Sequence, residues 1–208
     1  MTSTSAMPAQ QSTIDRIFGA VIDPQTWRNL LYLFISFPLG LIYFVTVVVL
    51  LSVGIGTMVI VVGIGLLILT FGLIRVYVAA ERALLRMLLN AVVPEPLPVR
   101  RPTGLIDRMM SYLSDAQLWK GLVYLLIHFV FGVGSFAMVM ALIPASLALL
   151  VAPLTYTLIP MYMINEPINS FDQAVLCCSA GAILGLFSLH LLNLWAAMWK
   201  RVSTALLT

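Results

Sequence analysis

The stretch Ile14–Gly40, IDRIFGAVIDPQTWRNLLYLFISFPLG, returns later in the chain as Ile106–Gly132, IDRMMSYLSDAQLWKGLVYLLIHFVFG. The second copy starts 92 positions after the first, and the two align without a gap. Matching positions include Ile14/Ile106, Asp15/Asp107, Arg16/Arg108, Asp23/Asp115, Gln25/Gln117, Trp27/Trp119, Leu30/Leu122, Tyr32/Tyr124, Leu33/Leu125, Ile35/Ile127, Phe37/Phe129 and Gly40/Gly132, while Arg28 corresponds to Lys120. An ungapped match of this length predicts a duplicated unit, so the architecture of one copy should hold for the other.

The composition excludes an ordinary soluble domain. Of the 208 residues 62% are hydrophobic and 9% are charged, whereas about a quarter of the residues in soluble domains are charged. The apolar residues gather in runs, and about 20 such residues suffice to cross a bilayer. The sequence therefore predicts an integral membrane protein whose first partner is the lipid bilayer.

The apolar runs predict four transmembrane helices arranged as two hairpins. Repeat 1 (13–92) has an interfacial helix and spans near 27–52 and 58–80, with a glycine-containing turn between the spans. A Pro/Arg linker (93–104) leads to repeat 2 (105–208), which has an interfacial helix, a span near 119–143, an external cap at 145–171 and a span near 173–199. Prolines at 153 and 160 interrupt the cap, so we expect a re-entrant or interfacial segment there.

The basic residues set the predicted topology. With four spans all 11 Lys and Arg residues fall on one side, whereas a fifth span through 145–164 would place Lys200 and Arg201 on the other. Because basic residues gather on the cytoplasmic side, both termini should be cytoplasmic. Both copies then enter from the same side, as parallel repeats about the membrane normal rather than as inverted repeats.

Each copy is expected to begin with an amphipathic helix lying in the headgroup plane. An aspartate, Asp23 or Asp115, then stands where a helix N-cap is needed. Aromatic and basic residues at the predicted ends of the spans should anchor them at the interface; they are Trp27, Arg28, Trp119, Lys120, Trp199, Lys200 and Arg201. Residues 1–12 carry no signal-peptide pattern, and we expect a disordered leader there.

These features resemble the membrane sensor domain of bacterial histidine kinases. The resemblance rests on Trp27-Arg28, Phe37-Pro38-Leu39-Gly40, the glycine-spaced run from Gly54 to Gly65, and Glu81-Arg82 after the second span. It implies a four-span module of the bacterial cytoplasmic (inner) membrane, with N- and C-termini cytoplasmic, that serves a two-component system. The family fuses this module to a kinase, but this chain stops at Thr208, so we expect it to act on a kinase in another chain.

The two histidines are the candidates for a cofactor site. His128 lies nine residues after Trp119, and His190 lies nine before Trp199. At a rise of about 1.5 Å per residue both would lie about 13 Å from the cytoplasmic interface, where they could hold a haem between them or each bind a chlorophyll-type pigment. The alternative is that each is neutral and hydrogen-bonds within the bundle. The first copy has Ser36 in place of His128, and we expect no cofactor.

Four glycines are candidate points of close helix contact: Gly40, Gly132, Gly181 and Gly185. The last two form a GxxxG motif, which allows either packing within the bundle or a homodimer. Arg75, near the end of the second span, is expected to extend toward the headgroups. Cys177 and Cys178 adjoin in an apolar run, which predicts buried thiols rather than a disulfide framework.

The chain shows no acid–base pair, nucleophile motif, phosphate loop, metal-ligand spacing or nucleic-acid signature, so we predict that it is not an enzyme. The leading hypothesis is a sensor-type module that detects a lipophilic ligand or membrane state, or docks another membrane protein through its helices. The alternative is an accessory subunit of a larger electron-transfer or photosynthetic complex. The predicted spans carry no charged residue at mid-depth, which argues against a transporter. A specific site would be expected in the second copy.

Overall fold

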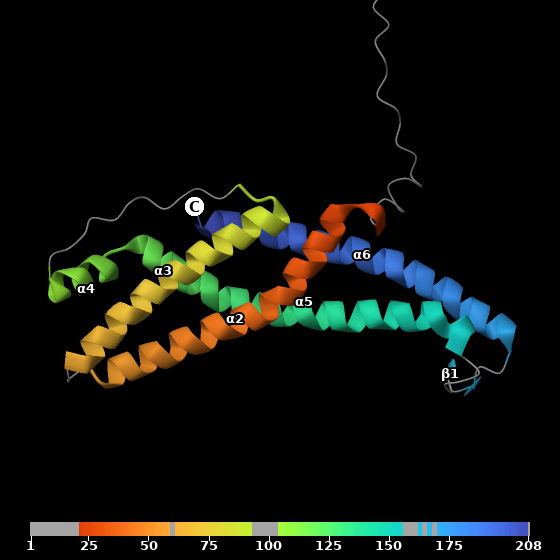
Figure 1. Cartoon of the computed structure of the whole chain (residues 1–208), viewed down its shortest axis with the longest axis horizontal. Coiled ribbons are helices and arrows are strands. Elements are labelled where there is room, and N and C mark those ends of the chain that lie inside the picture. Colours follow the sequence, from red (N-terminus) through yellow and green to blue (C-terminus); the bar gives the residue numbers. More distant parts are fainter. Residues whose placement is uncertain are drawn as a thin grey trace, which may run out of the picture.

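A computed structural model describes residues 21–58, 61–92, 104–155, 162–163, 166–167 and 170–207. The predicted leader, most of the first amphipathic segment, nearly all of the linker and part of the external cap lie outside these residues. The described part is almost entirely helical (Figure 1). Four long helices dominate it: α2 (Pro24–Gly56), α3 (Val61–Leu89), α5 (Ala116–Thr155) and α6 (Phe171–Leu207).

Each of these four helices is long and apolar enough to cross a membrane, which confirms the predicted all-α fold with four candidate spans. A short helix, α4 (Leu105–Leu113), precedes α5. Two strands of two residues each, β1 (Tyr162–Met163) and β2 (Glu166–Pro167), pair antiparallel between α5 and α6. They are the only strands in the described part of the chain.

The starts of α2 and α5 are built in the same way. The Asp23 side chain accepts a hydrogen bond from the backbone N–H of Gln25 at 2.9 Å, and Asp115 accepts one from Gln117 at 3.0 Å. The indole N–H groups also correspond, since Trp27 and Trp119 donate to carbonyls six residues earlier, at 3.1 and 3.0 Å. Corresponding residues of the two copies thus make corresponding local contacts, and the two aspartates cap the starts of their helices.

The helices run further than the apolar pattern indicated. Helix α5 continues through Pro144 and Pro153 to Thr155. We expected this span to end near residue 143 and a cap to follow it. Proline removes one backbone donor, so each of these prolines frees the carbonyl four residues earlier, but helices in apolar surroundings tolerate that loss. The prolines do not end this helix, and residues 145–155 belong to α5 rather than to a separate cap.

The two hairpins share one junction and point away from each other. In Figure 1 the α2–α3 turn and the α5–α6 turn lie at opposite ends of the long axis, and α2 crosses α5 between them. The stacked pairs Phe44–Phe129 and Phe37–Phe136, with centroids 4.5 and 4.8 Å apart, show that the order of contacts along α2 is reversed along α5. Each pair is the counterpart of the other under the 92-residue offset, so the contact has a local two-fold relation. The relation of this axis to the membrane normal stays a prediction.

Glycine allows the close crossing. A Cβ atom added at Gly132 would lie 2.6 Å from the Ser36 carbonyl oxygen, and one at Gly40 would lie 3.0 Å from the Phe129 Cα. Gly181 makes a similar contact within the second hairpin, because its added Cβ would lie 2.7 Å from the Leu149 Cβ. Gly185 differs, since its nearest neighbour would be 3.7 Å away, an ordinary contact. Of the four predicted glycines, three are therefore close-contact points and Gly185 is not.

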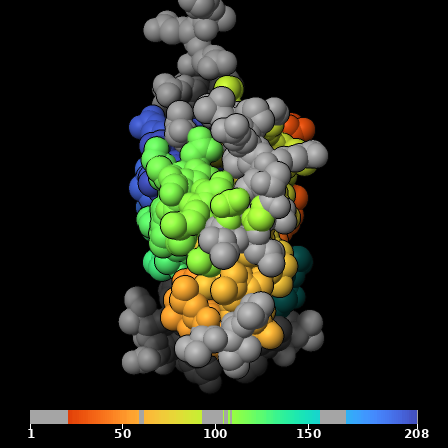
Figure 2. Space-filling model, turned by 90° about the vertical axis from the view of Figure 1, so that its left-hand side faces the viewer, coloured from red at the N-terminus to blue at the C-terminus, as the bar shows by residue number. Residues whose placement is uncertain are grey.

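Helix α4 lies on the surface against α3 and α5, next to the α2–α3 turn in the end-on view of Figure 2. Arg75 on α3 pairs with Asp115 at 2.6 Å, and its guanidinium carbon lies 4.5 Å from the centre of the Tyr112 ring. Arg75 thus connects the middle of α3 to the segment that joins α4 to α5. Its expected extension to the headgroups stays a prediction.

Candidate functional site

The centre of the candidate site is Glu81, a fully buried carboxylate in the last third of α3. The Tyr32 hydroxyl on α2 donates to Glu81 Oε1 at 2.5 Å, and the Tyr124 hydroxyl on α5 lies 3.3 Å from the same oxygen. The Nδ1 atom of His128, also on α5, is 3.6 Å from that oxygen. An O–H···O distance as short as that between Tyr32 and Glu81 is typical of a hydroxyl that donates to an ionised carboxylate.

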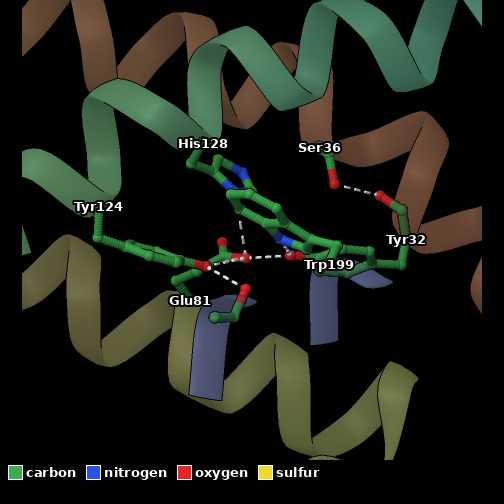
Figure 3. A network of polar contacts seen from close by, with 7 residues as sticks. Tyr32, Ser36, Glu81, Tyr124, His128 and Trp199 are labelled. Atoms are coloured by element: carbon green, nitrogen blue, oxygen red, sulfur yellow. Dashed lines mark hydrogen bonds and ion pairs between the residues drawn. The ribbon is translucent and has the colours of Figure 1, made fainter. Parts of the chain in front are cut away.

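Two residues of α6, Trp199 and Ser203, complete the group, and Figure 3 shows Trp199 next to Tyr32. The indole N–H of Trp199 donates to the Tyr32 hydroxyl at 2.9 Å, and the Tyr124 hydroxyl lies 3.4 Å from the Ser203 hydroxyl. We call these residues the Glu81 cluster: Tyr32, Glu81, Tyr124, His128, Trp199 and Ser203. Because they come from all four long helices, the cluster is the polar junction at which the two hairpins meet.

His128 is enclosed by aromatic rings rather than by hydrogen-bond partners. Its ring centre lies between 5.6 and 6.5 Å from the ring centres of five residues on α2, α5 and α6, which are Tyr32, Tyr43, Tyr124, Phe131 and Trp199. Within the described residues neither imidazole nitrogen has a hydrogen-bond partner, and the same is true of Glu81 Oε2. Buried polar atoms are nearly always bonded, so three open positions in one cluster set this site apart.

The structure does not bring the two predicted histidines together. His128 is fully buried, whereas His190 is exposed on α6. The nine residues between His190 and Trp199 correspond to two and a half helical turns, so His190 lies on the opposite face of α6 from the indole that contacts His128. A haem held between these two side chains does not fit this geometry. The two histidines do not lie at one level, because Trp199, nine residues from His190, packs beside His128 with ring centres 5.6 Å apart. Trp199 is therefore level with His128 rather than with Trp119.

The predicted anchors divide into two groups. Trp27 and Trp119 are 58% and 46% exposed, and Arg28, Lys120 and Arg201 are also on the surface. Trp199 is 3% exposed and belongs to the core, so its predicted place at the interface is wrong. The half-buried Lys200 donates from its ammonium to the Asn90 carbonyl at 2.8 Å, just after the end of α3.

Sequence reasoning missed Glu81 as a site residue. The second span was expected to end near residue 80, which would have left Glu81 at the cytoplasmic surface. A signal was nevertheless present, because Glu81 continues a helical spacing of buried apolar positions on α3, which are Leu67, Phe71, Ile74, Val78, Leu85 and Leu89. An acidic residue on the apolar stripe of a helix indicates a buried carboxylate that needs partners.

The described residues hold no group of three or more His, Cys, Asp or Glu side chains that could bind a metal ion. Cys177 is buried and Cys178 half-buried, and the two are not joined in a disulfide. The chemistry available in the cluster is therefore hydrogen bonding and proton exchange between one carboxyl group, one imidazole and three hydroxyls.

Comparison with known proteins gave one family. A family model described as "Putative sensor" matches residues 1–50 and 32–207. No curated protein matches the chain, and no solved structure does. Since the family match extends over nearly the whole sequence and accompanies four helices able to cross a membrane, this chain belongs to the sensor family that the model describes.

Proposed function

We propose that the protein is a non-enzymatic sensor module of the bacterial cytoplasmic membrane. It detects a lipophilic ligand or a membrane state as a change in the packing of its four helices, and it passes that change to a partner membrane protein. The observation that carries the proposal is the Glu81 cluster, in which residues of α2 and α5 bond or closely approach one buried carboxylate of α3. The tyrosine hydroxyls of that cluster in turn contact Trp199 and Ser203 of α6.

A buried polar junction suits a sensor because it favours discrete arrangements. Separating the Tyr32 hydroxyl from Glu81 would leave the Tyr32 O–H without its acceptor and the buried carboxylate with only the more distant Tyr124 hydroxyl. That loss costs several kcal/mol unless a second set of partners forms. Small displacements at such a junction are converted into alternative packings rather than into continuous deformation. A signal that stabilises one packing over the other then shifts the population of the module.

The outer surface supports detection from within the bilayer. Large apolar side chains stand exposed on all four long helices, among them Val49, Val76, Val130, Ile183 and Phe187. An apolar surface of this extent is matched to lipid and to molecules dissolved in lipid. The resemblance to sensor domains of histidine kinases supports a histidine kinase as the protein that receives the signal, and a homodimer of the module is compatible with that role.

The test is purification of the full chain from bacterial membranes in mild detergent, followed by mass determination and a phosphorylation assay with labelled ATP. We expect a monomer or dimer that associates with a histidine kinase whose autophosphorylation changes in Tyr32→Phe. The matched control is Tyr77→Phe, a half-buried tyrosine of α3 outside the cluster, which should leave the kinase unchanged. A fixed stoichiometric assembly with redox or pigment proteins, or a haem band that disappears in His128→Ala, would instead establish the accessory-subunit alternative.

A further inference from the structure

We infer that the Glu81–His128 pair is a proton-binding site, and that the proton is a ligand to which the four-helix junction responds. The inference rests on the proposed sensor function and names its signal. The pair comes from α3 and α5, both side chains are fully buried, and their nearest polar atoms are 3.6 Å apart.

The separation shows that the pair is close but not joined. A distance of 3.6 Å exceeds the range of a hydrogen bond, and Nδ1, Nε2 and Glu81 Oε2 have no partner among the described residues. The carboxyl oxygen that faces His128 also receives the Tyr32 hydroxyl at 2.5 Å. The structure thus shows a carboxylate already supplied with a donor, beside an imidazole with open positions for a proton.

Among the groups that meet at the junction, the Glu81–His128 pair is the main source of variable charge. From α2 it is faced by Tyr32 and Tyr43, from α5 by Tyr124, and from α6 by Trp199 and Ser203. Arg82 is the nearest cation along α3, but its guanidinium donates to the Leu207 carbonyl at the end of α6, at 3.0 Å. Around Glu81 the three tyrosine hydroxyls, the serine and the indole supply polar groups without a countercharge.

Proton uptake has a defined geometric effect. An imidazolium beside a carboxylate forms an N–H···O bond of about 2.8 Å, so His128 and Glu81 would approach by about 0.8 Å. Loss of the proton from His128 removes that attraction and leaves the carboxylate with its tyrosine donors alone. The proton is the only species transferred, and it is exchanged with the solvent.

The displacement would reach the contact between the two hairpins. A Cβ atom at Gly40 would lie 3.3 Å from the His128 carbonyl oxygen and 3.4 Å from its ring carbon Cδ2. The imidazole is therefore packed at the close crossing of α2 with α5. Its ring centre also lies 5.6 Å from that of the Trp199 indole on α6. Movement of this one ring changes the packing of α2, α5 and α6 together, which couples proton binding to the arrangement of both hairpins.

The experiment is nuclear magnetic resonance of the full chain in lipid nanodiscs, labelled with ¹⁵N only at histidine, from pH 4.5 to 8.5. The chain has two histidines; His190→Ser assigns their signals, and the exposed His190 of the unmodified chain serves as the control. We expect His128 to take up a proton within this range, and Glu81→Gln to require at least a tenfold higher proton concentration for it. Amide exchange along α2, at residues 36–44, should change over the same pH interval in the unmodified chain and not in His128→Ser, the residue found in the first copy.

The inference is overturned if His128 keeps one protonation state throughout, if Glu81→Gln leaves its titration unchanged, or if amide exchange does not follow it. Failure here is distinct from failure of the sensor function. The kinase response to Tyr32→Phe is measured at one pH, and it would persist if the module detects another signal.

Discussion

Replacement of Gly132 by alanine tests the crossing of α2 and α5 most directly. The added methyl group would lie 2.6 Å from the Ser36 carbonyl oxygen and 2.9 Å from its carbonyl carbon, where ordinary contacts begin at 3.4 Å. Both neighbours are backbone atoms, so no side chain can move aside and the helices must separate by about 0.8 Å. Extra methyl groups in a well-packed core cost about 1–3 kcal/mol.

The matched control is Gly134→Ala, two residues along the same helix, where the nearest atom to an added Cβ is a Trp195 ring carbon at 3.9 Å. Both variants gain about 1 kcal/mol of helix propensity, and that gain cancels when the two are compared. We expect Gly132→Ala to be less stable than Gly134→Ala by about 1–3 kcal/mol. For a chain of this size this corresponds to a midpoint lower by roughly 2–12 °C.

Thermal unfolding in one detergent, followed by circular dichroism at matched protein concentration, provides the measurement. Since the comparison is between two variants with the same chemical change, detergent effects common to both are removed. Equal midpoints, or a higher midpoint for Gly132→Ala, would refute the close backbone crossing and with it the route from His128 to the hairpin contact.

Two further predictions concern polar contacts. Tyr32→Phe should lower the free energy of unfolding by about 1.5–3 kcal/mol, as for a hydrogen bond to a charged group. Tyr124→Phe should lower it by less, because the Tyr124 hydroxyl is 3.3 Å from Glu81 whereas that of Tyr32 is 2.5 Å away. Equal losses in denaturant titrations of the two variants would contradict this order. A double-mutant cycle of Arg75→Gln and Asp115→Asn should give a coupling below about 1 kcal/mol that falls with added salt, because both side chains are partly exposed at 32% and 22%; a salt-independent coupling of several kcal/mol would show that the pair is shielded from solvent.

The sequence was sufficient to predict the helices but not all of their ends. Apolar runs and the paired Asp23 and Asp115 caps indicated four long helices and two of their starts, because these signals are local. The expected end of α5 was wrong because Pro144 and Pro153 do not break the helix but lie inside it. Proline stops a helix in water more effectively than in apolar surroundings, where the alternative is an unsatisfied backbone.

The candidate site was harder to predict, because its residues are far apart in sequence and their pairing depends on helix register. Trp199 is followed by Lys200 and Arg201, the usual pattern of an interfacial anchor, yet the indole is buried against His128. No single-helix pattern separates the two cases. The position of Trp199 follows from the length of α6 past this point, which the apolar run did not reveal.

The duplication explains why the cluster forms where it does. Tyr32 and Tyr124 occupy the same position of the two copies, and both hydroxyls approach the one Glu81 oxygen. The 92-residue offset does not extend to α3 and α6, because α2 ends at Gly56 whereas the matching residue, Ala148, lies inside α5. A symmetric pair of donors therefore meets a single acceptor, as expected where two copies of one unit pack about a local two-fold relation.

Symmetry is then broken by the residue one helical turn further along. At that position the first copy has Ser36, whose hydroxyl donates to the Tyr32 carbonyl in its own helix at 2.7 Å, and the second has His128, which faces the carboxylate. The serine hydroxyl has its hydrogen-bond partner within α2 and needs none from the other hairpin. The histidine, in contrast, has two ring nitrogens without a hydrogen-bond partner beside Glu81. A duplicated scaffold supplies the shared donors, and one substitution in the second copy supplies the titratable partner, so the capacity to respond to a proton arises from the difference between the copies rather than from their likeness.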